Sequence, residues 1–223
     1  AERALCRLVV EEGRAATDET VPTLAEMISE ARGRILVNVD NKLDLSVLPE
    51  IAAVVREAGA FGQVIVKQNV WNGERVDEAR AVAARVADAL VFMPIVADDA
   101  VDDPAFVEKV SRAFGPMAME MIAWRGEADA KLLGGPLFSP RMRAVASRGN
   151  WHMWINTHPI VNMPAGMLSA GRGDELAVLA GRPEEAYGFW IERGATIIQT
   201  DEPRAAIAWL EANGYRIPYD LTN

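Results

Sequence analysis

Residues Arg193–Gly214 read RGATIIQTDEPRAAIAWLEANG, and this stretch decides the class of fold. An apolar strand is expected over Thr196–Ile198, and the polar run TDEP at 200–203 follows it closely. A helix is expected next and ends at the closing glycine, where helices commonly stop. Its apolar face is formed by Ile207, Trp209 and Leu210. A strand, a polar loop and a helix in this order make one unit of a parallel α/β fold, in which polar groups gather where the strands end.

The composition limits the class of the protein and its partners. The 223 residues are 50% hydrophobic and 25% charged, which suits one soluble domain with a sizeable core. A net charge of −9 argues against a nucleic-acid partner, because phosphate backbones are bound through clustered lysine and arginine. The longest apolar stretch, 87–97, is interrupted by Asp88 and Pro94, so no transmembrane segment of about 20 residues is expected.

The start of the chain carries an expectation of its own. The sequence begins at Ala1 and shows no signal-peptide pattern. We therefore expect that either a leader or an earlier part of a longer protein is missing. The localisation stays open between the cytoplasm and export.

The remainder of the chain repeats the same unit. Six strands, each followed by a helix, are expected at 35–40, 63–67, 89–96, 117–123, 151–156 and 196–198. This alternation predicts a parallel sheet, either doubly wound and open or an eight-unit barrel that lacks two units. A dinucleotide-binding open sheet needs a glycine-rich turn after its first strand, and Asp40–Asp44 contains no glycine. We therefore predict a (β/α)8 TIM-type barrel, built by a single domain over residues 1–223 whose first two units are missing.

The segment Val37–Lys42 is the clearest internal signal for a site. Side chains alternate along a strand, so Asn38, Asp40 and Lys42 share one face, which would point into a barrel. A carboxylate and an ammonium at one strand end suit a metal ion and an anionic substrate. The alternatives are a helix cap or a surface ion pair in a loop.

Two charged residues on later strands extend this hypothesis. Lys67 ends the next strand and is expected at the same mouth as a second phosphate contact; otherwise it reaches into solvent. Glu120 lies in an apolar strand, where an acid is costly unless a cation pairs with it. We therefore expect Glu120 as a second metal ligand beside Asp40. The alternative is a shorter strand that leaves Glu120 exposed.

The strand WHMWINT at 151–157 places His152, Trp154 and Asn156 on one face. An aromatic ring with an amide at the strand end suits a substrate pocket, although barrel-core packing explains Trp154 equally well. His152 is expected to be a hydrogen-bonded core histidine, and His158 is a weak candidate for acid–base work. The long loop 158–182 has the length of a lid.

Four motifs, in order, resemble the glycerophosphodiester phosphodiesterase family. They are PTLAE at 22–26, the strand ending in acid-x-Lys at 37–42, the tryptophan-and-asparagine strand at 154–157, and the closing signature with T-D-x-P at 194–203. Their order and spacing agree across nearly the whole chain. The resemblance implies a phospholipase-C-like phosphodiesterase barrel that uses Ca²⁺ or Mg²⁺. Such enzymes hydrolyse a glycerophosphodiester to glycerol 3-phosphate and an alcohol, a reaction of lipid and glycerol metabolism.

The resemblance also assigns roles to single residues. Asp40 stands at a metal-ligand position where the family usually has Glu, Lys42 contacts the phosphate as the catalytic cation, and Trp154 lines the glycerol side. The family's His-Arg-Gly motif, its acid-x-Asp metal pair and its second histidine are absent from the sequence. This chain alone is therefore expected to be inactive.

The leading hypothesis is a metal-dependent phosphodiester hydrolase that acts on a small anionic phosphodiester. Lys42 and Lys67 would neutralise the phosphoryl charge, while Asn38 and Asn156 would contact the substrate. One alternative is a degenerate barrel that binds a phosphoryl ligand or a protein partner without chemistry. A second is another phosphate-handling barrel, such as an isomerase or a phosphatidylinositol-specific lyase. That reading needs a glycine-rich loop that opens a short helix at the last two strands, and the TDEP run does not offer one.

Overall fold

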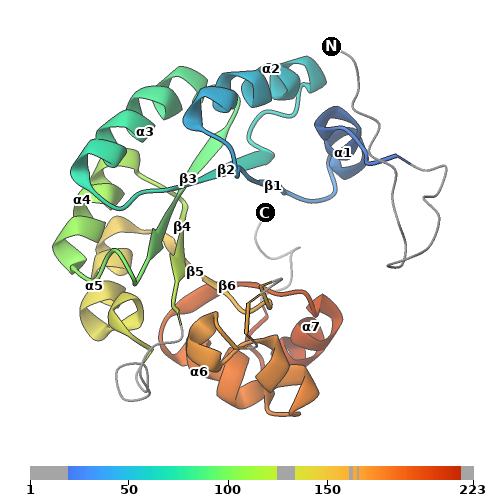
Figure 1. The fold of residues 1–223 in the computed structure, drawn as a ribbon. Coiled ribbons are helices and arrows are strands. Elements are labelled where there is room, and N and C mark those ends of the chain that lie inside the picture. The colour runs from blue at the N-terminus through green and yellow to red at the C-terminus, as the bar shows by residue number, and fades with distance from the viewer. Residues whose placement is uncertain (1–19, 125–133, 161–162, 165, 217–223) are drawn as a thin grey trace. The chain divides into compact units, whose positions relative to one another are not determined.

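The computed structural model describes residues 20–124, 134–160, 163–164 and 166–216 (Figure 1). The helices and strands of these residues are, in chain order, α1 Leu24–Ala31, β1 Val37–Asp40, α2 Leu48–Ala58, β2 Val64–Asn69, α3 Gly73–Val86, β3 Val91–Ala97, α4 Pro104–Phe114, β4 Ala118–Ile122, α5 Pro140–Gly149, β5 His152–Asn156, α6 Phe189–Glu192, β6 Ala195–Gln199 and α7 Pro203–Ala212. No helix in this described part is long and apolar enough to cross a membrane.

The strands confirm the predicted alternation but not the predicted barrel. Within the described residues, six strands form one parallel sheet in the order β1-β2-β3-β4-β5-β6. The prediction of a closed, eight-stranded TIM-type barrel is wrong, because this order has two ends, β1 and β6. Strand–helix alternation is common to open sheets and to barrels, whereas closure depends on strand number and stagger, which the alternation does not specify.

The chain divides into two compact units, which we describe separately. The N-terminal unit comprises residues 1–66 and 82–91, and the C-terminal unit comprises 67–81 and 92–223. Residues 1–19 lie outside the described residues, so the expectation that a segment is missing before Ala1 stays a prediction.

In the N-terminal unit, helix α1 starts at a capping box. The Thr23 hydroxyl accepts a hydrogen bond from the Glu26 amide, and the Glu26 carboxylate accepts one from the Thr23 amide. Strand β1 starts at Val37 and not at Ile35 as predicted. The Ile35 amide instead donates to the Ala31 carbonyl and prolongs the turn that follows the helix. The core of this unit is formed by Ile28, Leu45, Leu48, Val55 and Val64.

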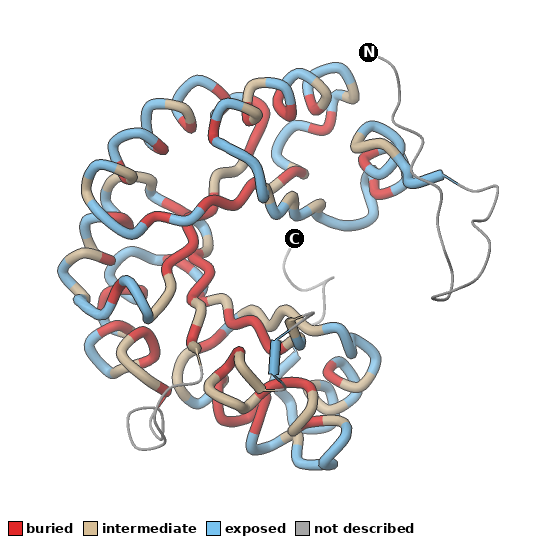
Figure 2. The backbone as a smooth tube through the Cα atoms, in the orientation of Figure 1, coloured by how far each residue is buried: buried red, intermediate tan, exposed pale blue. Residues whose placement is uncertain are grey.

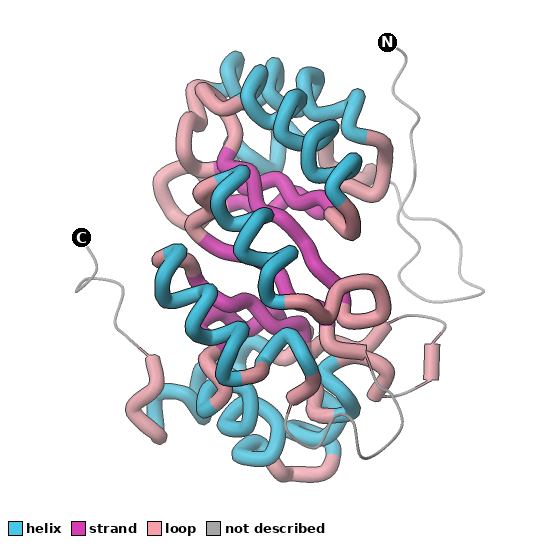
Figure 3. Tube along the Cα trace, turned by 90° about the vertical axis from the view of Figure 1, so that its left-hand side faces the viewer, coloured by secondary structure: helices cyan, strands magenta, loops and turns pink. Residues whose placement is uncertain are grey.

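In the C-terminal unit, the two faces of the sheet differ in chemistry. Met119, Met121 and Ile155 are fully buried on one face, over which helices α4 and α5 pack (Figures 1 and 3). The opposite face carries polar side chains at the alternate positions, among them Glu120 and Asn156. Buried residues follow the strands closely (Figure 2). Strand periodicity therefore separates an apolar helix-covered face from a polar face on the same strands.

Between the long loop and β6, the chain forms a π-helical turn, Glu184–Gly188, followed by the short helix α6. Trp190 at its centre is fully buried, with its ring edge-on to Phe138 at 4.7 Å between centroids. Its indole N–H donates to the Arg172 carbonyl at 3.0 Å. Trp190 thus packs against Phe138 through its ring and holds the long loop after β5 through its hydrogen bond to the Arg172 carbonyl.

Candidate functional site

The polar face of the C-terminal unit contains a connected group of side chains that we call the Lys67 cluster. Its members come from strands β2, β4, β5 and β6. Glu120 pairs with Trp154 across β4 and β5, and Asn156 pairs with Gln199 across β5 and β6. Parallel register therefore brings these four positions together, and β2 adds the lysine. The cluster consists of Lys67, Glu120, Trp154, Asn156 and Gln199.

The Lys67 ammonium is surrounded on several sides although it is fully buried. Its Nζ lies 2.5 Å from Glu120 Oε2 and donates to Gln199 Oε1 at 3.2 Å. It also lies 5.1 Å from the centroid of the Trp154 ring, within the range of a cation–π contact. A buried cation is tolerated only with such compensation, because its desolvation is costly.

The acceptor side of the cluster is less complete. Glu120 Oε1 accepts a hydrogen bond of 2.7 Å from Asn156 Nδ2. Glu120 Oε2 is buried and lies 2.5 Å from Lys67 Nζ, and this ammonium is its only partner among the described residues. The Trp154 indole N–H is shared between Asn156 Oδ1 at 3.1 Å and Gln199 Oε1 at 3.2 Å. Because a carboxylate oxygen can accept more than one hydrogen bond, Glu120 Oε2 could accept a second one from a ligand in addition to its contact with Lys67.

Four of the predicted site residues meet in this cluster, namely Lys67, Glu120, Trp154 and Asn156. Glu120 is next to a cation, as expected, but the cation is the lysine. Sequence reasoning missed Gln199, because it ended the last strand at Ile198. Extending the strand by one residue places Gln199 on the same face as Ile197, opposite Asn156.

The other predicted site residues lie in the N-terminal unit. Asn38 and Asp40 are exposed and alternate with half-buried Val37 and Val39, so the predicted two-faced strand is confirmed. Lys42 Nζ lies 2.7 Å from Asp40 Oδ2, and both side chains are accessible to solvent. This arrangement matches the alternative of a surface ion pair. Such a pair leaves the roles predicted for Asp40 and Lys42 without a contact that supports them.

The two histidines, His152 and His158, lie in different surroundings. His152 is exposed at the start of β5, with Nδ1 3.0 Å from Thr196 Oγ1, so the expectation of a core histidine is wrong. His158 Nδ1 is buried and has no hydrogen-bond partner among the described residues.

The divalent-metal site stays a prediction, and its two predicted ligands, Asp40 and Glu120, lie in different units of the chain. Within them, no group of three or more His, Cys, Asp or Glu side chains is close enough to hold a metal ion. Asp40 and Glu120, the two predicted ligands, are each paired with a lysine. Ca²⁺ needs six to eight oxygen ligands and Mg²⁺ near-octahedral coordination, as a general rule. We therefore derive no chemical step through a metal.

The polar run TDEP at 200–203 supplies two of the hydrogen-bond donors that surround the carboxylate of Asp174. Asp174 is almost fully buried and accepts hydrogen bonds at Oδ1 from the hydroxyls of Thr157 and Thr200, each at 2.8 Å. Tyr187 OH donates to the same oxygen at 3.2 Å, and the Asp201 amide donates to Oδ2 at 2.9 Å. These four hydrogen bonds, which we call the Asp174 latch, connect the long loop after β5 to the end of β6.

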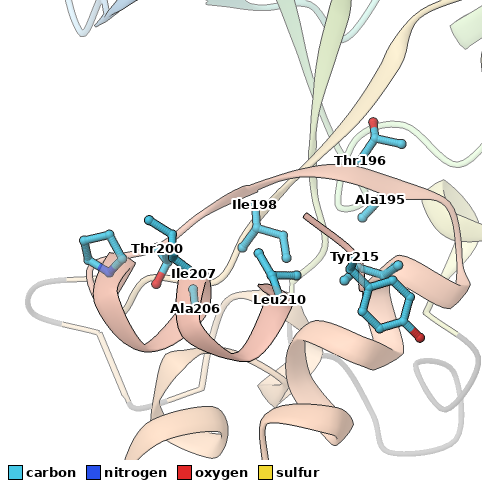
Figure 4. A pocket seen from close by; sticks show the side chains of 10 residues that line it. Ala195, Thr196, Ile198, Thr200, Ala206, Ile207, Leu210 and Tyr215 are labelled. Carbon is cyan, nitrogen blue, oxygen red and sulfur yellow. The ribbon is translucent and has the colours of Figure 1, made fainter. Parts of the chain in front are cut away.

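An apolar pocket of about 380 Å³ lies between β6 and α7 (Figure 4). Ile198 and Leu210 point into it from the two elements, and Tyr215 stands at its end. Among the residues that line it, none is charged and the polar groups are hydroxyls. It therefore offers packing surface but no obvious chemistry for a phosphodiester.

We expect the Lys67–Glu120 pair to behave as a buried ion pair. Lys67→Met should lower the free energy of unfolding by about 3–5 kcal/mol, because it leaves the Glu120 charge uncompensated. The double variant Lys67→Met/Glu120→Leu should recover most of that loss, since no isolated charge remains. Urea denaturation measures both. Lys42→Met, at the exposed pair, is the control and should cost less than about 1 kcal/mol. Equal effects of the two lysine substitutions would contradict the assignment.

The Asp174 latch predicts a pH effect at Tyr187. Burial, with the nearby Asp174 carboxylate adding to it, raises the pKa of Tyr187 to about 12. The folded state therefore holds this proton more tightly than the unfolded state, whose tyrosine pKa is about 10. The stability that this difference contributes is complete below about pH 10 and is lost as the pH rises towards 12.

Urea denaturation of wild type and Tyr187→Phe across this pH range measures the effect. The difference between their free energies of unfolding should be constant below about pH 10 and should shrink above it. A difference that stays constant up to pH 12 would show that the hydroxyl titrates normally.

A family model, DUF4996, described as a domain of unknown function, matches residues 92–210, which is more than half of the chain. No curated protein matches the chain. The matched stretch runs from β3 into α7 and contains Glu120, Trp154, Asn156 and Gln199. The chain therefore belongs to the DUF4996 family of domains of unknown function.

Proposed function

We propose that this chain recognises a glycerophosphodiester at the Lys67 cluster and acts as a phosphodiester hydrolase of the glycerophosphodiester type. The observation that carries the proposal is a fully buried ammonium beside a carboxylate oxygen whose only partner among the described residues is that ammonium. The four motifs that resemble the phosphodiesterase family support the same substrate class, and one of them contains Trp154 and Asn156.

The chemistry of the cluster suits a ligand that is both anionic and hydroxylated. The Lys67 ammonium supplies positive charge for a phosphoryl oxygen. Its contact with Gln199 Oε1, at 3.2 Å, is longer than its contact with Glu120 and is the one that such an oxygen would replace more easily. A ligand hydroxyl would donate to Glu120 Oε2, and the carbon chain of glycerol would lie against the Trp154 ring. The role assigned to these residues is binding and charge neutralisation.

A second candidate function is binding without hydrolysis. The specific observation in its favour is that the two carboxylates predicted as metal ligands, Asp40 and Glu120, are each held by a lysine. A protein that holds the diester needs the cation and the hydroxyl acceptor but no activated water. The two candidates share the ligand and differ in whether the phosphodiester bond is broken.

The proposal is tested with sn-glycero-3-phosphocholine. Calorimetry measures binding, and a coupled assay measures release of glycerol 3-phosphate, each with Ca²⁺, with Mg²⁺ and with chelator. We expect binding that Glu120→Gln weakens by about tenfold, or about 1.4 kcal/mol, because the amide replaces one of the two acceptor oxygens with a donor that cannot accept from the ligand hydroxyl. Glu192→Gln, at a side chain that is 71% exposed, is the matched control and should bind like wild type.

Each result of this experiment decides between stated outcomes. Release of glycerol 3-phosphate supports the hydrolase, and saturable binding without release favours the second candidate. The absence of binding, or equal binding by Glu120→Gln and wild type, would show that the cluster does not recognise this ligand.

A further inference from the structure

A second pocket, of about 250 Å³, lies at the carboxyl ends of β2, β3 and β4 in the C-terminal unit. Its floor is apolar and includes Ile95, which is almost fully buried, and Ile122. Its rim includes Trp71, Asp99 and Trp124. Ligands of parallel α/β sheets bind at the carboxyl ends of the strands, so this is a position where a ligand is expected.

The pocket continues the polar face that carries the Lys67 cluster. Asn69 lines it and follows Lys67 by two residues, and Ile122 lines it and follows Glu120 by two. In the sheet, Ile95 pairs with Glu120, and the next pair on that face is Ala97 with Ile122. Side chains two residues apart on a strand share a face and are about 6.6–6.8 Å apart. The pocket is therefore one strand pleat beyond the cluster.

The two indoles give the pocket its chemistry. Trp71 is 49% exposed, and the Arg75 guanidinium lies 5.2 Å from its ring centroid, so this ring already holds a cation. Arg75 itself is paired with Glu78 and bonded to the Asn69 carbonyl. The π face of an indole is the strongest site for such contacts among the aromatic side chains.

Trp124 is held in place by its backbone. Its amide donates to Asp98 Oδ1 at 3.0 Å, and it forms a β-bridge with Leu168. Its indole Nε1 is buried and has no hydrogen-bond partner among the described residues. The backbone at this second indole is therefore held in place, and the indole N–H is open to a hydrogen-bond acceptor.

The charge at the rim is negative. Residues 98–103 read DDAVDD, and two of these carboxylates have structural work, since Asp98 accepts from Trp124 and Asp103 caps α4. Asp99 lines the pocket, is exposed, and forms no ion pair with another described residue. Two indoles beside a carboxylate that no described side chain neutralises favour a cation with an apolar surface over an anion or a neutral ligand.

We propose that this pocket is a subsite for an alkylammonium head group, such as the choline or ethanolamine part of a glycerophosphodiester. The proposal rests on the proposed function for the identity of the whole ligand, but the cation site stands on its own residues. With the phosphoryl group at Lys67, an ester oxygen and two carbons can bridge one pleat and bring the ammonium between Trp71 and Trp124. The leaving alcohol would then be an amino alcohol.

Choline chloride alone tests the subsite, because it carries the cation without the phosphodiester. Calorimetry should show saturable binding that Trp71→Leu and Asp99→Asn each weaken by about fivefold or more. Both side chains are at the exposed rim, so the variants should keep the wild-type circular dichroism spectrum and urea midpoint. Asp77→Asn, at an exposed position of α3, is the matched charge control and should bind like wild type.

A neutral isostere separates cation recognition from apolar contact. In 3,3-dimethylbutan-1-ol a carbon replaces the nitrogen of choline, and we expect at least tenfold weaker binding. Equal binding of the two compounds, or no effect of either rim substitution, would overturn the subsite. Choline binding without binding of glycerophosphocholine would leave the subsite standing and remove the proposed function.

Discussion

The ion pair between Lys67 and Glu120 is the constraint on which the polar face of the C-terminal unit depends. An ammonium with no exposed surface is stable only beside an opposite charge, and the 2.5 Å contact with Glu120 supplies it. The requirement also fixes register. A slip of β4 by one residue would turn Glu120 to the apolar face and bring Met119 or Met121 to the polar one. Lys67 contacts side chains of β4 and β6, so one buried charge constrains the register of several strands.

A second buried charge, Asp174, organises the carboxyl edge of the same unit. Its four hydrogen bonds join the end of β5, the long loop and the start of the last loop. Close to it, Ser169 and Ala170 both have positive φ, near 50°, which is unfavourable for residues with a side chain. The Ser169 hydroxyl bonds to the Asn156 carbonyl. The loop conformation is thus held by polar contacts next to a residue of the Lys67 cluster.

Local patterns predicted a large part of this arrangement. Alternation along β4 and β5 placed Glu120, Trp154 and Asn156 on one face, because side-chain direction in a strand has a period of two. The need of a buried acid for a cation predicted a partner for Glu120. Gln199 was missed since strand ends are the least certain part of such a prediction. The Asp174 latch could not be predicted, because its donors, from Thr157 to Asp201, lie far apart in the sequence and meet only through tertiary packing.

The barrel prediction failed for a different reason. A strand followed by a helix has the same local pattern in an open sheet and in a closed barrel, and the number of strands in the sheet is a property of the whole assembly. The metal site stays a prediction. In the structure, each of its two predicted ligands, Asp40 and Glu120, contacts a lysine, and these partners could not be identified from the sequence. The Lys67 cluster is a buried cation surrounded by an indole ring and two amide side chains, and it lies next to the carboxyl ends of the strands, where parallel sheets bind ligands.

The most direct test of this account is a crystal structure of the protein with sn-glycero-3-phosphocholine. The account predicts a phosphoryl oxygen within hydrogen-bond distance of Lys67 Nζ and a glycerol hydroxyl at Glu120 Oε2. It also predicts the ammonium between Trp71 and Trp124. A ligand bound away from these residues, with the contacts of the Lys67 cluster unchanged, would contradict it.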